Sequence, residues 1–415
     1  MISYESFTLN NGLRVLFHRE PSSPMAVVNV LYDVGARDED PERTGFAHLF
    51  EHLMFGGSKH IPDFDAPLQA AGGQSNAFTS NDITNYYDIL PAQNIDTALW
   101  LESDRMLSLA FTDKSLEVQR QVVIEEFKQR YLNQPYGDAW LHLRPLVYKK
   151  HAYRWATIGK NIKQIQEASM EEVRAFFQQY YHPSNAILCI IGDFDLATIQ
   201  QKVEHYFGDI PAQKKAARNL IQEPAQKQFR TKTLVRKVPA TAFYYAFRMG
   251  KRTDSDFYQA DLLSDFLGNE KTSPLYIELK KKKKICAEIT AYITASFDDG
   301  LFIISGKLQP GKTIDQLETA LWPLLEKTAA KTISKSSLHE LKLKLRTSRA
   351  FQDQGLLNRA MNLAYFELLG SAHLINEEAQ KYQHISTKDL QAFALQTFRK
   401  TNCSRLIIQS QQDAK

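Results

Sequence analysis

The order of apolar and polar residues predicts several strands in the first half of the chain. Runs rich in β-branched and aromatic residues alternate with short turn segments, which is typical of strands. Asn10-Asn11-Gly12 separates the first two runs, and an Asn-Gly pair at this position favours a β-hairpin. The expected strands cover residues 7–9, 13–17, 26–32, 75–79, 84–90 and 185–193.

Between these strands, apolar residues recur every three or four positions, which predicts helices with one buried face. The most apolar of these helices follows Thr44 and ends before Gly56-Gly57, a pair expected just beyond a helix C-terminus. The expected helices cover residues 46–55, 63–72, 93–109, 114–132 and 169–181.

The second half of the chain repeats the order of strand, turn and helix, with the strand at 242–247 and the helix at 258–267. A polar segment without apolar periodicity, residues 213–232, is expected to link a first domain at 1–212 to a second at 233–415. The alternative is two unrelated α/β domains that share this order. Aligned on the helix, the positions of His48, Glu51 and His52 are taken by Asp261, Ser264 and Asp265.

The composition is that of an ordinary soluble globular protein. Of 415 residues, 43% are hydrophobic and 24% are charged, which argues against a disordered or collagen-like chain. The 51 Lys and Arg residues against 47 Asp and Glu residues leave a net charge of +4, too small to favour nucleic-acid binding. No apolar run reaches the length of about 18 residues that a transmembrane helix needs, so no membrane partner is expected.

The expected location in the cell is the cytoplasm. The N-terminus lacks the basic segment followed by an apolar segment that is typical of a secretory signal peptide. The three cysteines are odd in number and far apart, which argues against a disulfide framework and favours reduced thiols.

His48, Glu51 and His52 form the strongest chemical signal in the chain. Two histidines four residues apart lie on one face of a helix, so both imidazoles can reach a single Zn²⁺ at about 2.0–2.1 Å. Glu51 lies three residues after His48, close to the same face, where it can hold a metal-bound water without being a ligand. The order of the three residues is the inverzincin pattern His-x-x-Glu-His.

A catalytic zinc needs a third protein ligand and one open position. The best donor is expected in the helix at 114–132, where the adjacent carboxylates Glu125 and Glu126 compete. Glu126 follows Val122 by four residues and Val123 by three, so it shares their expected inward face. We therefore choose Glu126.

Three segments resemble the pitrilysin family of zinc metallopeptidases, which includes insulin-degrading enzyme and mitochondrial processing peptidase. Residues 45–58 resemble the active-site helix of that family, and residues 72–79 are similar to its substrate-side edge strand. Residues 120–126 are similar to the segment that carries the third zinc ligand, which matches Glu126. The resemblance covers nearly the whole chain, whose length is that of one subunit of the two-subunit members.

The resemblance implies an α+β fold of two homologous α/β domains, each a mainly antiparallel sheet packed with helices, which together form half of a peptidase clamshell. It implies a zinc endopeptidase that hydrolyses peptides or unfolded polypeptides in a chamber between two subunits. His48, His52 and Glu126 would hold Zn²⁺, and Glu51 would move a proton from water to the leaving amine. The substrate would bind as an added strand beside Asn76, Ala77, Phe78 and Thr79.

The sequence departs from the family pattern at three positions. Gln119 stands where the family usually has a Glu near the site, which puts the support of a zinc ligand in doubt. Lys280 and Ala287 stand where many members have an Arg and a Tyr that contact substrate, and neither can replace the forked or hydroxyl donor. We therefore expect a homologous partner subunit to supply this pair in a heterodimer, with a homodimer as the alternative.

Two other functions stay open. Some family members are non-catalytic scaffold subunits, although a scaffold has no need of the complete set of ligands and base. The run of five lysines at 280–284 is also compatible with binding of an acidic polymer. The small net charge favours a solvated surface instead.

Overall fold

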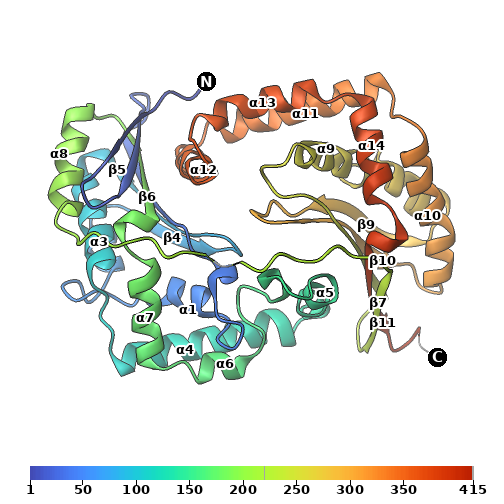
Figure 1. Cartoon of the computed structure of the whole chain (residues 1–415), viewed down its shortest axis with the longest axis horizontal. Coiled ribbons are helices and arrows are strands. Elements are labelled where there is room, and N and C mark those ends of the chain that lie inside the picture. The colour runs from blue at the N-terminus through green and yellow to red at the C-terminus, as the bar shows by residue number, and fades with distance from the viewer. Residues whose placement is uncertain (219, 414–415) are drawn as a thin grey trace. The chain divides into compact units, whose positions relative to one another are not determined.

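The computed structural model describes residues 1–218 and 220–413, and these residues form two compact units, each built around one β-sheet (Figure 1). The units do not follow the expected division into 1–212 and 233–415, because each unit includes one segment from the other half of the chain. Unit 1 comprises Met1–Phe127, Trp155–Leu220 and Arg349–Glu378, and unit 2 comprises Lys128–Arg154, Ile221–Ser348 and Ala379–Lys415.

The sheet of unit 1 has the strand order β1-β2-β6-β3-β5-β4. Only β2 and β6 pair in parallel, and the other neighbours are antiparallel. The expected hairpin at Asn10-Asn11-Gly12 is confirmed, since it joins the antiparallel pair β1 and β2. The strands are β1 (Glu5–Thr8), β2 (Arg14–Arg19), β3 (Met25–Tyr32), β4 (Gln74–Thr79), β5 (Thr84–Pro91) and β6 (Ala186–Gly192).

The sheet of unit 2 has the order β7-β11-β8-β10-β9, and only β7 and β11 pair in parallel. Without β1, the sheet of unit 1 has the same order and the same strand directions, which confirms two α/β domains of one topology. β7 begins at Arg230, inside the segment that was expected to be a linker. The strands are β7 (Arg230–Arg236), β8 (Ala242–Arg248), β9 (Cys286–Ile293), β10 (Leu301–Leu308) and β11 (Cys403–Ser410).

Both faces of the sheet in unit 1 are covered by helices. Every residue of β6 is buried, which explains why this strand is an unbroken apolar run rather than an alternating one. α3 packs on β3 and β5, and α12, from late in the sequence, packs on β3 and β6 from the other side (Figure 1). The α-helices of unit 1 are α1 (Phe46–Leu53), α2 (Asp65–Ala70), α3 (Ile95–Leu107), α4 (Asp113–Phe127), α6 (Ile162–Gln166), α7 (Met170–Tyr180), α8 (Leu196–Phe207) and α12 (Leu356–Leu368).

In unit 2, alternate residues of the central strands face two separate cores, as the two-residue period of a strand requires. On β8, Phe243, Tyr245 and Phe247 face the core formed with α9, α10 and α14, whereas Ala242 and Ala246 face a core formed with α5. α5 therefore covers one face of this sheet although it precedes the sheet in the sequence. The α-helices of unit 2 are α5 (Ala139–Val147), α9 (Asp256–Gly268), α10 (Ile314–Ala330) and α14 (Thr387–Thr397).

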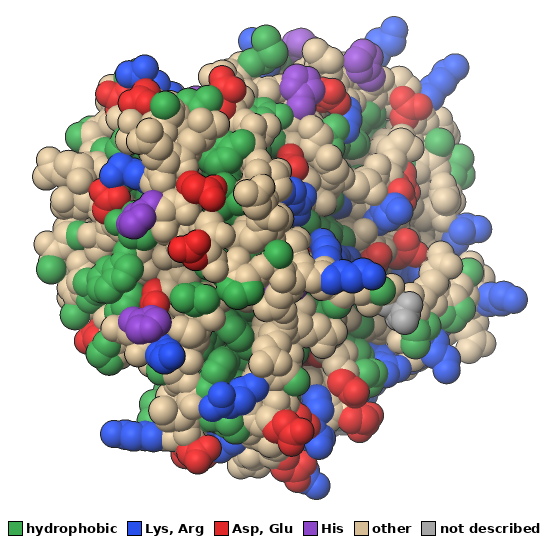
Figure 2. Space-filling view, turned by 60° about the vertical axis from the view of Figure 1, so that its left-hand side comes forward, with side chains coloured by type: hydrophobic (Ala, Val, Ile, Leu, Met, Phe, Trp, Pro, Cys, Tyr) green, Lys and Arg blue, Asp and Glu red, His purple; other side chains and the backbone are tan. Residues whose placement is uncertain are grey.

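The remaining helices are short turns, π-helical segments or helices that continue from one unit into the other. Among the described residues, no helix is both long and apolar enough to span a membrane. All three cysteines are buried and unbonded. On the face shown in Figure 2, basic and acidic side chains are interspersed. The remaining elements are η1 (Ala36–Asp38), η2 (Ala92–Asn94), π-helix η3 (Lys128–Leu132), η4 (Ala152–Arg154), η5 (Pro183–Asn185), π-helix η6 (Tyr276–Lys282), α11 (Lys335–Gln352), α13 (Leu374–His384) and η7 (Lys400–Asn402).

Candidate active site and metal centre

The helix α1 starts at a position that only glycine suits. Gly45, its N-terminal cap, has φ of +92°, in the left-handed region that side chains disfavour. A Cβ at this position would lie 2.8 Å from the carbonyl oxygen of Ile158. The path of the chain into α1 therefore depends on this glycine. The same path sets the orientation of the helix that carries His48.

Glu39 caps the N-terminus of α1 from six residues upstream of Gly45. Its carboxyl oxygens accept hydrogen bonds from the backbone N–H groups of Gly45 and Ala47, each at 2.9 Å, and from the indole N–H of Trp155 at 3.0 Å. These bonds satisfy donors that a helix start leaves open. Burial raises the pKa of Glu39 to about 8, although the three donors act in the opposite direction. A single acidic residue in a loop carries no sequence signal, so the sequence did not reveal this role.

His48 and His52 lie one turn apart on α1, and Glu126 of α4 reaches both. The Oε2 atom of Glu126 lies 3.6 Å from His48 Nε2 and 3.2 Å from His52 Nε2. The three side chains are 10%, 23% and 16% exposed, so they lie at a partly open surface of unit 1 rather than deep in its core.

This arrangement fits a zinc ion. Ligands about 2.0–2.1 Å from a tetrahedral zinc are separated from one another by ~3.3 Å, which is close to the two distances at Glu126. One ligand atom from each of the three residues lies within 4.8 Å of the other two. Across the described parts of both units, this is the one such group of His, Cys, Asp and Glu side chains.

The structure brings Glu126 to the histidines, and its role as a zinc ligand stays a prediction, but part of the argument for choosing it over Glu125 was wrong. Glu125 is exposed and Glu126 is half-buried. Val123 is buried, whereas Val122 is 45% exposed and does not belong to an inward face. α1 packs on α4, and this contact turns Glu126 toward the histidines. Helical periodicity alone cannot show which side of α4 is covered.

Glu51 lies on α1 between the two histidines in sequence and is half-buried. The charge of Glu51 affects the pKa of two buried tyrosines. Burial raises the pKa of Tyr86 and of Tyr181, and the negative charge of Glu51 adds to the rise in both. Tyr86 comes from β5 and Tyr181 from the end of α7, and no spacing in the sequence links either of them to the histidine motif.

Gln119 lies beside the C-terminal end of α1. Its side-chain nitrogen is 3.9 Å from the point where a Cβ would stand at Gly56. The structure therefore places Gln119 near the site. Its supporting role stays a prediction.

The residues predicted to bind substrate form β4, the edge strand of the unit 1 sheet, which is in contact with α1. One long side of β4 pairs with β5, and its other side has no strand neighbour among the described residues. The N–H of Ala77 donates to its neighbour Asn76 at 2.8 Å, and the Phe78 ring is 39% exposed. Asn76, Ala77, Phe78 and Thr79 thus form an accessible edge, and their role in substrate binding stays a prediction.

The corresponding positions of unit 2 carry no equivalent centre among the described residues. Asp261 accepts a hydrogen bond from Tyr382, and Asp265 from Asn269. Lys280 lies on η6 with its ammonium 5.3 Å from the ring centre of Tyr276. Ala287 lies on the edge strand β9, where the pairing with β10 shifts and leaves it without an opposite residue.

Two protein-family models match the chain. A model described as "Insulinase (Peptidase family M16)" matches residues 14–145, which include the histidine motif and Glu126. A model described as "Peptidase M16 inactive domain" matches residues 167–345.

Several bacterial and mitochondrial proteins are similar in sequence. Zinc protease PqqE of Helicobacter pylori is 31% identical over 82% of this chain and 78% of that protein. An uncharacterized zinc protease of Bacillus subtilis, YmxG, is 26% identical over 72% of each protein. The mitochondrial-processing peptidase subunit beta of Saccharomyces cerevisiae is 26% identical over 49% of this chain and 44% of that subunit.

Solved structures show the same fold. A protease from Helicobacter pylori superimposes with a TM-score of 0.93 and 27% identity, over 99% of this chain and 100% of that chain. Pitrilysin superimposes with a TM-score of 0.82 and 18% identity, over 98% of this chain but 45% of pitrilysin. This chain therefore spans a little under half the length of pitrilysin.

Proposed function

Because this chain belongs to peptidase family M16, we propose that it is a zinc-dependent endopeptidase that hydrolyses peptides or unfolded polypeptides. The observation that carries the proposal is the group of His48, His52 and Glu126, whose ligand atoms lie within 4.8 Å of one another. Relatives named as zinc proteases carry the same implication for the metal.

Each residue of the site has one task in this proposal. His48, His52 and Glu126 would hold the zinc ion. When bound, zinc polarises the scissile carbonyl and makes a water acidic enough to lose a proton near neutral pH. Glu51, beside the ligands on α1, takes that proton and then donates it to the leaving amine. The cap by Glu39 keeps α1 in the orientation that this exchange requires.

The substrate would extend the unit 1 sheet by pairing with the open side of β4. In an antiparallel strand, alternate residues direct their main-chain groups to opposite sides. The N–H of Ala77 is bonded to the Asn76 side chain, so we infer that Ala77, and by alternation Ser75 and Thr79, face the open side. A substrate strand would replace the Asn76 bond with main-chain bonds of its own, which gives affinity with little sequence selectivity.

A second, homologous subunit would complete the chamber. Lys280 and Ala287 occupy the places where the family pattern has an Arg and a Tyr. The structure places Lys280 over a tyrosine ring and Ala287 at a bulge. Neither residue supplies the forked guanidinium donor of Arg or the hydroxyl donor of Tyr. Pitrilysin, in addition, has about twice the length of this chain. A heterodimer with a chain that carries the pair is therefore proposed, with a homodimer as the alternative.

The test compares zinc content and hydrolysis of a quenched fluorescent peptide for the wild type and Glu51→Gln. We expect one zinc per chain in both, and a loss of kcat of about 100- to 10,000-fold in the variant, because a general base contributes that much. Glu42→Gln, at a glutamate whose side chain is 83% exposed, is the control and should match the wild type.

Two other outcomes separate the alternatives. One zinc per chain with almost no wild-type hydrolysis would point to a missing subunit. A chain that binds no zinc would contradict the ligand assignment and favour a non-catalytic scaffold, in which case the intact motif would have no role.

A further inference from the structure

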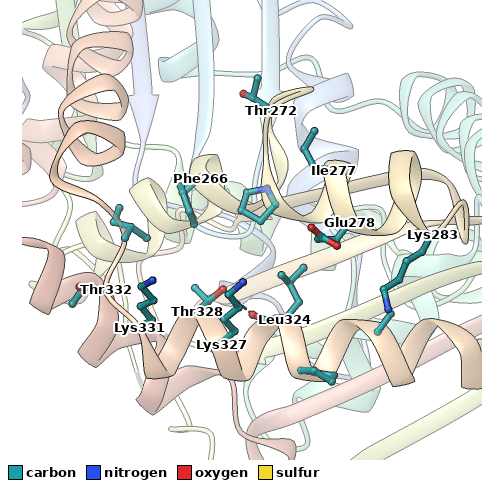
Figure 3. A pocket seen from close by; sticks show the side chains of 14 residues that line it. Phe266, Thr272, Ile277, Glu278, Lys283, Leu324, Lys327, Thr328, Lys331 and Thr332 are labelled. Atoms are coloured by element: carbon teal, nitrogen blue, oxygen red, sulfur yellow. Dashed lines mark hydrogen bonds between the residues drawn. The ribbon is translucent and has the colours of Figure 1, made fainter.

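A groove in unit 2 lies between the helical segment η6 and helix α10. It has a volume of about 550 Å³ and is lined by residues of α9, η6 and α10, by the loop between α9 and η6, and by the residues that follow η6 and α10. Figure 3 shows Leu324 and Lys327 on one helix, facing Glu278 on the other. All residues that line the groove belong to unit 2, whereas the candidate zinc site belongs to unit 1.

The floor of the groove is apolar. Phe266, Leu324 and Ile333 line it and pack against the main core of unit 2, yet each remains half-buried rather than covered. Ile277 adds another half-buried apolar side chain from η6. Apolar area of this kind stays in contact with water in the isolated chain, so a ligand that covers it gains hydrophobic free energy.

The rim of the groove is positively charged. Lys283, Lys327 and Lys331 are exposed, and none of their ammonium groups has a carboxylate within 4 Å among the described residues. The one acidic residue of the lining, Glu278, is engaged by Lys282 at 2.6 Å. Lys327 lies in the last turn of α10 and Lys331 is the residue that follows the helix, and both line the groove.

We propose that this groove binds a small organic acid from solution, with an apolar body and one anionic headgroup. The apolar floor would hold the body, and the three unpaired lysines would hold the headgroup. A volume of about 550 Å³ is within the range of small-molecule sites. The proposal concerns a second site and does not depend on the peptidase function.

An acidic polymer fits these observations less well. In the run at 280–284, Lys280 and Lys281 lie over the ring of Tyr276, and Lys282 is paired with Glu278. Only Lys283 of the run lines the groove. The lysine run is therefore not one continuous basic surface, and a polymer would leave the apolar floor unused.

The test is calorimetric titration of decanoate into the full chain, with decyltrimethylammonium as a cationic probe of equal chain length. We expect saturable binding of one decanoate per chain, weakened by added salt because the lysines are exposed. The cation should not bind. Absence of saturable decanoate binding, or equal binding of both probes, would overturn the proposal.

Charge-removing variants locate the binding site. Lys327→Gln combined with Lys331→Gln should weaken decanoate binding by about tenfold, since each exposed ion pair contributes modestly. The matched control, Lys227→Gln combined with Lys237→Gln, removes two exposed lysines of unit 2 outside the groove and should leave the affinity unchanged. Equal affinities in the two double variants would refute the site, and thermal unfolding would verify that both remain folded.

Discussion

At the scale of the residue, the candidate site depends on which of two adjacent glutamates turns toward the histidines. Glu126 lies 3.2 Å from His52, whereas Glu125 is exposed. The two residues have the same chemistry and differ only in the side of α4 on which they lie. They therefore provide a matched pair for measuring the contribution of position alone.

Replacing Glu126 with Gln should lower the affinity for zinc by at least about 100-fold. Loss of a residue that only hydrogen-bonds to a metal ligand already lowers metal affinity by roughly 10- to 100-fold, and loss of a charged ligand should lower it further. The measurement is competition with a chromogenic chelator. Glu125→Gln is the control, and comparable weakening in both variants would contradict the assignment of Glu126.

Glu39 gives a pH dependence with a defined sign. Its pKa rises from 4.5 to about 8 on folding, chiefly through burial. Below about pH 4.5 the carboxyl is protonated in both the folded and the unfolded chain, so the contribution of Glu39 to stability is complete. As the pH rises from 4.5 to 8 the unfolded chain ionises first, and this contribution is lost.

The stability advantage of the wild type over Glu39→Gln should therefore be largest near pH 5 and should shrink toward pH 8. Gln keeps one acceptor oxygen for the start of α1 but does not titrate in this range. Thermal unfolding of both proteins with a chelator present, at several pH values, measures the difference. A stability advantage of the wild type that grows with pH would contradict this prediction, because it would mean that the three hydrogen-bond donors keep the Glu39 carboxylate ionised.

At the scale of the element, α12 is the helix whose position the order of the sequence does not suggest. It lies beyond residue 350, yet it covers β3 and β6 of unit 1. α5 does the reverse, since it precedes β7 but covers the sheet of unit 2. Each sheet thus has its second face buried by a helix from the other half of the chain.

Truncation of a buried side chain of α12 should destabilise unit 1. Leu363 is fully buried, so Leu363→Ala should lower the free energy of unfolding by about 2–5 kcal/mol. Urea unfolding measures the change. Leu395→Ala, at a position that is 56% exposed, should change it by no more than about 0.5 kcal/mol. A small effect at Leu363 would mean that α12 does not cover the sheet in solution.

At the scale of the whole molecule, the question is whether one chain is sufficient for hydrolysis. The proposed zinc ligands and the proposed base lie in unit 1. At the two positions where the family pattern has Arg and Tyr, unit 2 carries Lys280 and Ala287. Under the proposed function, this division would give a chain that prepares the attack on a peptide but lacks two contacts to the substrate.

The double variant Lys280→Arg and Ala287→Tyr should therefore raise the hydrolytic activity of the purified chain by about tenfold, if two copies can face each other. One additional hydrogen bond to a charged group, or to a charge that develops in the transition state, stabilises it by enough free energy for a rate change of at least about tenfold. Peptide hydrolysis combined with light scattering would measure activity and oligomeric state together. Full activity of the unaltered chain alone would contradict the need for a partner.

The local features of this protein follow from the sequence by itself. A helix repeats every 3.6 residues, so His48 and His52 had to lie one turn apart, and a strand repeats every two, so β8 had to present alternate residues to opposite faces. The Asn-Gly turn between β1 and β2 and the similar order of elements in the two halves also depend on short-range geometry. These features could be predicted because each involves residues close together in the chain.

Only the tertiary structure decided the features that join distant segments. Val122 was expected to be buried and is exposed, because the covered side of α4 depends on where α1 packs. Glu39 accepts a hydrogen bond from Trp155, which lies more than a hundred residues later in the sequence. The strands that α12 covers, β3 and β6, precede it by an even larger separation in sequence. The lysines of the groove are brought together from α10 and the end of η6. Such contacts depend on which surfaces bury one another, and no periodicity within one element contains that information.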